Sequence, residues 1–117
     1  MHYKYEELES TLIIYLEGQL IGSEEVNKLS DFLNNIKDKD KIKGKDKIII
    51  DLAAVPFISS LVVGLFIKFH KAMFDNNIKL AFINANSTIS EIFKITRVDL
   101  SLNIFPTLQE AIDYLKT

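Results

Sequence analysis

The sequence predicts an α/β fold, in which helices pack on a β-sheet within one domain spanning residues 1–117. Apolar segments with strand character alternate along the chain with amphipathic helical segments, which is the pattern of such folds. The composition, 48% hydrophobic and 26% charged, is that of a folded globular chain. No internal repeat or linker marks a second domain. We therefore expect one core built from all the elements.

Two strands and a helix are expected in the first third of the chain. Residues Tyr3 to Leu8 and Thr11 to Leu16 are rich in β-formers and suit a pair of strands. After Gly18 and Gly22, Ser23 is the expected capping hydroxyl of a helix, because two carboxylates follow it in the first turn. One face of this helix is apolar, with residues at helical spacing: Val26, Leu29, Phe32, Leu33 and Ile36.

The charged run that follows, "KDKDKIKGKDK" over residues 37–47, is typical of a solvated loop. Its lysines outnumber its aspartates, so a docking patch is the alternative interpretation. Mixed-sign runs are usually exposed surface, and we favour the loop.

The segment from Ile48 to Ile67 carries one charge in twenty residues, a length that could cross a bilayer as a helix. Asp51 near one end and Pro56 in the middle argue against a span. We expect instead a buried strand over Ile48 to Leu52, followed by a helix from about Ser60 to Phe74.

The last third repeats the alternation. A strand is expected over Ile78 to Ile83, then a short helix in "NSTISEIFKIT", where Thr88 and Glu91 have capping-box spacing. "LSLNIFP" predicts a short extended piece. The final helix, "TLQEAIDYL", repeats the capping signature with Thr107 and Glu110.

Several functional classes are not favoured. A net charge of −2 offers no basic field for nucleic acid or an anionic membrane surface, and the chain contains no cysteine. The start, "MHYKYEELES", lacks an apolar signal core, so we expect a cytoplasmic protein without membrane insertion. Glycine-rich nucleotide motifs are absent, and two isolated histidines predict no metal site. No cofactor is expected.

A hydrolytic triad of Ser60, His70 and Asp51 has the right residue types. However, ten residues on one helix separate Ser60 from His70 by about 15 Å, too far for a nucleophile and its base. "FISSL" also lacks the glycines of a nucleophile elbow. We therefore predict a protein that is not an enzyme, and His70 as a partly exposed helix residue.

The paired serines Ser59 and Ser60 stand where the central strand passes into its helix. Ser59 can cap the helix by accepting a backbone N–H of the first turn. A hydroxyl exposed at this positive helix end would also tolerate a phosphate, whose charge would repel an apolar partner.

The chain from "LEGQLIGSEEVNKL" through "IIIDLAAVPFISSLVVGLFIKFHKAM" to "FKITRVDLSLNIFPTLQEAIDYL" resembles a STAS domain, the fold of bacterial anti-sigma factor antagonists. In that family an apolar strand ending in Asp-Leu precedes an Asp-Ser-[Ser/Thr]-Gly-[Leu/Ile] motif and an amphipathic helix. Asp51 and Leu52 match the strand end, and Ser59 and Ser60 match the paired hydroxyls. Ile58 and Leu61 stand where the family usually has Asp and Gly. The resemblance implies a STAS-like mixed β-sheet, with an early antiparallel strand, a parallel core and about four helices.

The resemblance also implies a function. An unmodified chain would bind and sequester an anti-sigma factor with serine kinase activity and so release a sigma factor. That partner, with its own bound ATP and Mg²⁺, would phosphorylate Ser60, with Ser59 as second choice, and a phosphatase would reverse the step. The expected partner-binding residues are Ile58, Ser59, Ser60, Leu61, Val62 and Val63.

Two alternatives remain open. The chain could be a non-switched STAS adaptor or scaffold subunit of a stress-signalling assembly or a lipid-transport system, with both serines as caps. An exposed apolar patch near Leu61 could also be covered by a second copy of the chain, as a homodimer.

Overall fold

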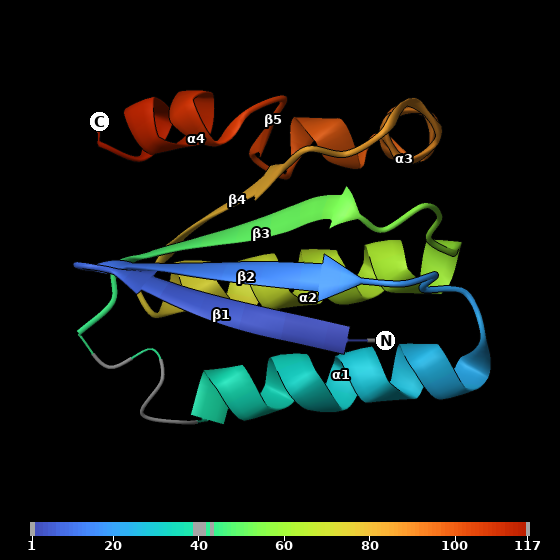
Figure 1. Cartoon of the computed structure of the whole chain (residues 1–117), viewed down its shortest axis with the longest axis horizontal. Coiled ribbons are helices and arrows are strands. Elements are labelled where there is room, and N and C mark those ends of the chain that lie inside the picture. Colours follow the sequence, from blue (N-terminus) through green and yellow to red (C-terminus); the bar gives the residue numbers. More distant parts are fainter. Residues whose placement is uncertain (1, 39–41, 43, 117) are drawn as a thin grey trace.

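The computed structural model describes residues 2–38, 42 and 44–116, and it contains a five-stranded sheet covered by helices (Figure 1). The strands occur in the sheet in chain order: β1 (His2–Leu8), β2 (Thr11–Glu17), β3 (Lys47–Ala54), β4 (Lys79–Ile83) and β5 (Ile104–Phe105). The helices between and after them are α1 (Ser23–Asp38), α2 (Ser60–Asp75), α3 (Ser87–Ile95), the 3-10 turn η2 (Val98–Leu100) and α4 (Leu108–Leu115). The predicted α/β order is confirmed.

The sheet is mixed. β1 and β2 pair antiparallel through a two-residue turn, with Leu8 opposite Thr11, whereas every later neighbouring pair is parallel. Parallel neighbours need a crossover connection, and here a helix supplies each one. Consequently the carboxyl ends of β2, β3 and β4 and the starts of α1, α2 and α3 lie at one end of the molecule, at the right in Figure 1.

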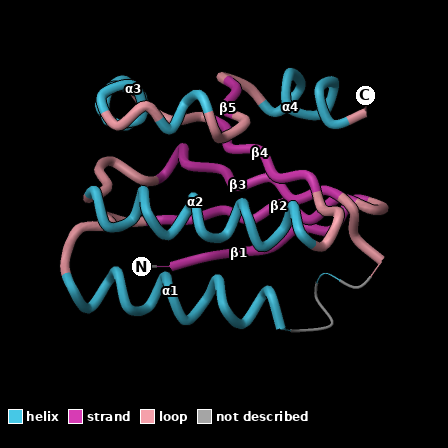
Figure 2. Tube along the Cα trace, turned by 180° about the vertical axis from the view of Figure 1, so that it is seen from behind, coloured by secondary structure: helices cyan, strands magenta, loops and turns pink. Residues whose placement is uncertain are grey.

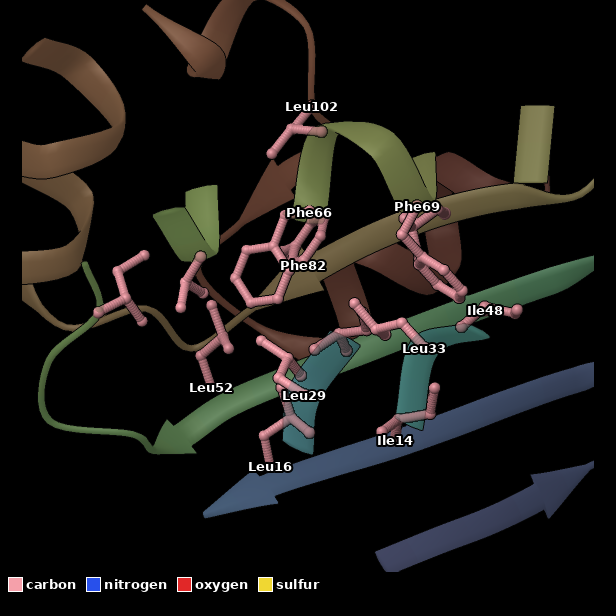
Figure 3. Packing of buried hydrophobic residues seen from close by; sticks show 14 of the residues in the cluster. Ile14, Leu16, Leu29, Leu33, Ile48, Leu52, Phe66, Phe69, Phe82 and Leu102 are labelled. Carbon is pink, nitrogen blue, oxygen red and sulfur yellow. The ribbon is translucent and has the colours of Figure 1, made fainter. Parts of the chain in front are cut away.

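Both faces of the central strands are buried. Alternate residues of the strands, such as Ile14 and Ile48, pack with α1 and α2 residues such as Leu33 and Phe69 in the larger core (Figure 3). The intervening residues, such as Ile13 and Ile49, pack against α4 on the opposite face. This two-sided burial explains why β3 is almost uniformly apolar.

The apolar segment from Ile48 to Ile67 does not form one helix. It is divided into β3, a loop through Pro56 and the first half of α2. Among the described residues, no helix has the length and hydropathy that a membrane span requires.

The structure confirms only some of the predicted capping residues. Thr107 is confirmed, because its side chain accepts the N–H of Glu110 at 3.2 Å. The prediction that Thr88 caps α3 is wrong. The helix begins at Ser87, and the side chain of Asn86 accepts the N–H of Ile89 at 2.8 Å. Ser23 is the first residue of α1 itself, preceded by Gly22, whose carbonyl accepts the Val26 N–H.

Two further predictions meet the structure only in part. The piece "LSLNIFP" is extended only at Ile104 and Phe105. Its first residue, Leu100, is the last residue of the 3-10 turn η2. This turn buries the side chains of Val98 and Leu102, and the Leu102 N–H donates to the Val98 carbonyl. Four residues of the charged run after α1, residues 39–41 and 43, lie outside the described residues.

Candidate functional site

The site begins with Ser60, which is the first residue of α2 and is exposed to solvent. The loop of residues 55–59 brings the chain from the end of β3 to this position. The apolar face of α2 that follows, including Val62 and Phe66, is buried against the sheet. The backbone of Ser60 is therefore held at the N-terminus of a well-packed helix.

Hydrogen bonds to its backbone hold the loop before Ser60 on both sides. On one side, Leu20 and Ile58 form an isolated parallel bridge, in which the Leu20 N–H donates to the Phe57 carbonyl and the Ser59 N–H to the Leu20 carbonyl, both at 3.0 Å. On the other side, the side-chain amide of Asn86 donates to the Pro56 carbonyl at 3.0 Å. Three loops at one end of the sheet thus define the surroundings of Ser60.

The bridge also decides which side chains face solvent. Neighbouring residues of an extended segment point to opposite sides, and Ile21 and Phe57, which adjoin the inward Leu20 and Ile58 (each 0% exposed), face outward. Ile21 is 45% exposed and Phe57 is 40% exposed. Leu61, in the first turn of α2, is 66% exposed. We call Ile21, Phe57 and Leu61, together with Ser60, the Ser60 patch.

Three of the six predicted partner-binding residues cannot contact a partner through their side chains. Ile58 and Val62 are 0% exposed and Val63 is 3% exposed. Ile58 is turned inward by its bridge to Leu20, and the two valines lie on the inner face of α2. Of the predicted set, Ser60 and Leu61 are exposed and Ser59 is half-buried.

Sequence reasoning missed two exposed residues of the patch, Ile21 and Phe57. The available signal was a large apolar residue beside a loop-forming one: Ile21 directly precedes Gly22, and Phe57 directly follows Pro56. Their proximity depends on the pairing of two segments that are far apart in the chain. No local pattern reports that pairing.

Ser59 occupies the N-cap position of α2, as predicted, but its hydroxyl does not cap the helix. The residue has extended backbone angles, and its carbonyl accepts the N–H groups of Val62 at 3.1 Å and Val63 at 3.3 Å. The Oγ atom is buried and has no hydrogen-bond partner among the described residues. Such an unsatisfied buried group costs about 1–3 kcal/mol. Ser60 therefore offers the accessible hydroxyl of the pair.

The electrostatics of the patch are simple. The positive end of the α2 dipole lies at Ser60, and the first turn of α2 contains no acidic residue. The three loops, residues 18–22, 55–59 and 84–86, also contain no lysine or arginine. Within these loops and this turn, the helix end alone would stabilise an added negative charge.

The structure does not assemble Ser60, His70 and Asp51 into a triad. Ser60 and His70 lie ten residues apart on α2, about 15 Å along its axis. The Asp51 carboxylate accepts the Ala53 N–H at 2.8 Å and the Asn84 amide at 3.2 Å, so it organises the end of β3. Within the described part of the chain, no three His, Asp or Glu side chains are grouped to hold a metal ion.

The family follows from comparison with known proteins. The sequence model of the STAS domain family matches residues 2–111. The chain therefore belongs to the STAS domain family. Comparison with curated proteins finds no match.

Solved structures share the fold over nearly the whole chain. An anti-sigma factor antagonist from Mycobacterium paratuberculosis is 15% identical with a TM-score of 0.84, covering 99% of this chain and 94% of that one. A STAS domain protein from Planctomyces limnophilus, also described as an anti-sigma factor antagonist, is 16% identical with a TM-score of 0.80, covering 98% of each chain.

The anti-sigma factor antagonist SpoIIAA of Bacillus is similar in two states. Its unphosphorylated form is 19% identical with a TM-score of 0.68 and covers 98% of each chain. Its phosphorylated form is 19% identical with a TM-score of 0.66, covering 97% of this chain and 99% of that one.

Proposed function

We propose that this chain is an anti-sigma factor antagonist whose binding to a kinase anti-sigma factor is controlled by phosphorylation of Ser60. The observation that carries the proposal is the Ser60 patch: an accessible hydroxyl at a helix start, next to the exposed apolar side chains Ile21, Phe57 and Leu61. The existence of SpoIIAA in phosphorylated and unphosphorylated forms supports this kind of control in a chain of the same fold.

In the unmodified state, the patch buries its apolar side chains against the partner. Removing Leu61, at 66% exposure, and its neighbours from water favours association. The Ser60 hydroxyl is small and neutral, and it can be accommodated at such an interface through one hydrogen bond. The anti-sigma factor is then sequestered, and its sigma factor is released.

In the modifying step, the Ser60 oxygen attacks the γ-phosphorus of ATP. The bond from that phosphorus to the bridging oxygen breaks, ADP leaves with the electron pair, and the serine proton passes to a base of the partner. The partner binds the ATP and Mg²⁺, and this chain supplies only the acceptor. A phosphatase restores the hydroxyl by transferring the phosphoryl group to water.

Phosphorylation weakens the complex through charge. The phosphate brings about −1.5 to −2 charges into an apolar patch whose loops contain no lysine or arginine. In the free chain, water and the α2 dipole stabilise that charge, whereas burial against the partner removes the water. The switch therefore needs no large change in the fold.

The test is a phosphorylation assay with a candidate kinase, ATP and Mg²⁺, read by intact mass. We expect one phosphate on the wild-type chain and on Ser59→Ala, and none on Ser60→Ala with an unchanged circular dichroism spectrum. A phosphate that persists on Ser60→Ala, or failure of every candidate kinase to modify the chain, contradicts the proposal.

A second function, a STAS adaptor or scaffold subunit without a switch, is favoured by one observation. Leu61, at the position where the family usually has Gly, is the most exposed side chain of the patch's apolar trio, which suits a permanently apolar interface. Ser60→Asp separates the two functions. The switch requires at least about a tenfold loss of partner affinity, with Ser60→Asn as the neutral control, whereas a constitutive adaptor retains its affinity.

A homodimer through the patch predicts a different result. Analytical ultracentrifugation would then show a mass that rises with concentration in the wild type and remains monomeric in Leu61→Asp. A monomeric mass at all concentrations would contradict the homodimer and would mean that the Ser60 patch binds a different protein.

A further inference from the structure

A cleft of about 470 Å³ lies at the end of α2 that is remote from Ser60. The last turns of α2, the start of β4 and α4 form its walls. In Figures 1 and 2 the C-terminal parts of α2 and α4 lie at the same end of the molecule, opposite the loops of the Ser60 patch. Its volume is in the range of small-molecule sites in proteins. The cleft is independent of the proposed function.

The lining of this cleft combines two exposed aromatic rings with polar side chains, among them Asn77 and Asn103. Phe74 of α2 is 73% exposed and Tyr114 of α4 is 44% exposed, and both line it. Ile78 and Leu80 also border the cleft, but their side chains are buried in the core. Two large rings from different helices, exposed around one hollow, are more typical of a ligand site than of a plain surface.

One cation is available in the cleft. Lys79 lines it, and its ammonium makes no ion pair among the described residues. His70 also borders the cleft, and burial lowers the pKa of its imidazole, so that the ring is neutral at pH 7. The charge that a ligand meets there is therefore a single positive one.

Carbonyl groups in the last turn of α2 already accept hydrogen bonds from within the chain. The Met73 carbonyl accepts the N–H groups of Asn76 and Ile78, and the Phe74 carbonyl accepts the N–H of Asn77. The Ala72 carbonyl accepts the side-chain amide of Asn76 at 2.7 Å. The C-terminal end of the α2 dipole is negative, so the Lys79 ammonium is the feature of the cleft lining that attracts an anion.

We propose that the cleft between the end of α2 and α4 binds a small aromatic carboxylate. The ring of the ligand packs between Phe74 and Tyr114, and the carboxylate pairs with the Lys79 ammonium. A single cation suits a singly charged carboxylate, whereas a phosphate or polyphosphate site would gather several donors.

The test is an NMR titration of the ¹⁵N-labelled full chain with indole-3-acetate and with its neutral counterpart indole-3-acetamide. Saturable shifts are expected at the amides around Phe74, Lys79 and Tyr114, with the carboxylate binding about two- to fivefold tighter than the amide. In Lys79→Gln the two probes should bind equally. Lys71→Gln, an exposed lysine of α2 outside the cleft, should retain the difference.

Phe74→Ala tests the aromatic wall and should weaken both probes by about two- to tenfold. Its matched control is Ile95→Ala, because Ile95 of α3 is likewise 73% exposed and lies outside the cleft. Shifts that do not saturate, shifts centred on the Ser60 patch, or a carboxylate preference that survives Lys79→Gln would overturn the proposal.

Discussion

Exposed apolar side chains lie near both ends of α2, but in different electrostatic settings. At its start, Leu61 and its neighbours surround a neutral hydroxyl in loops without lysine or arginine. At its end, Phe74 and Tyr114 stand beside the permanent charge of Lys79. A neutral hydroxyl can gain a charge by modification, whereas an ammonium carries a charge without modification. One end is thus suited to a switched interface and the other to constant recognition of an anion.

The largest expected effect tests whether Ile58 belongs to the core or to the Ser60 patch. Because its side chain is fully buried, Ile58→Ala should lower the free energy of unfolding by about 2–4 kcal/mol in urea denaturation. Phe57→Ala, the exposed neighbour, should cost less than about 1 kcal/mol. Equal losses for the two variants would mean that the Leu20–Ile58 bridge does not orient this loop in solution.

A smaller effect is expected at Ser59. Its buried Oγ has no partner among the described residues, so Ser59→Ala removes an unsatisfied polar group and should leave the stability unchanged or raise it by about 1 kcal/mol. Thr107→Ala is the matched control, because that cap does accept an N–H, and its loss should cost about 0.5–2 kcal/mol. A loss at Ser59 as large as at Thr107 would show that the Ser59 hydroxyl does cap α2.

The smallest effect concerns pH at the other end of α2. Burial lowers the pKa of His70 in the folded chain below its ordinary value of 6.5. The unfolded chain therefore binds the proton more tightly, and stability falls as the pH drops below 6.5 but is unaffected above it. Urea midpoints from about pH 8 to about pH 5.5 should fall less in His70→Gln than in the wild type. Parallel curves for the two proteins would contradict a desolvated imidazole.

Much of the fold could be predicted because its signals are local. The change from a β-branched run to helical spacing around Pro56 located β3 and α2, and placed Ser60 at the helix start. Cap positions were less certain, since several residues near one helix start can accept its N–H groups. At α3, Asn86 makes that bond and Thr88 does not.

The candidate site was only partly predictable. The position of Ser60 follows from the sequence, and its phosphorylation remains a proposal. The sequence placed Ile58, Val62 and Val63 in the partner-binding set, whereas the structure buries their side chains, because an apolar run beside a serine does not reveal which residues turn inward.

The sequence by itself determined the order of the elements and the hydroxyl at the start of α2, since both depend on residues that are close in the chain. Only the tertiary structure decided which side chains surround that hydroxyl. The bridge from Leu20 to Ile58 joins segments that α1 and β3 separate, and it buries Ile58 while it turns Ile21 and Phe57 outward. The orientation of a loop residue depends on the strand or loop that it pairs with, and that partner is set by the packing of the whole domain.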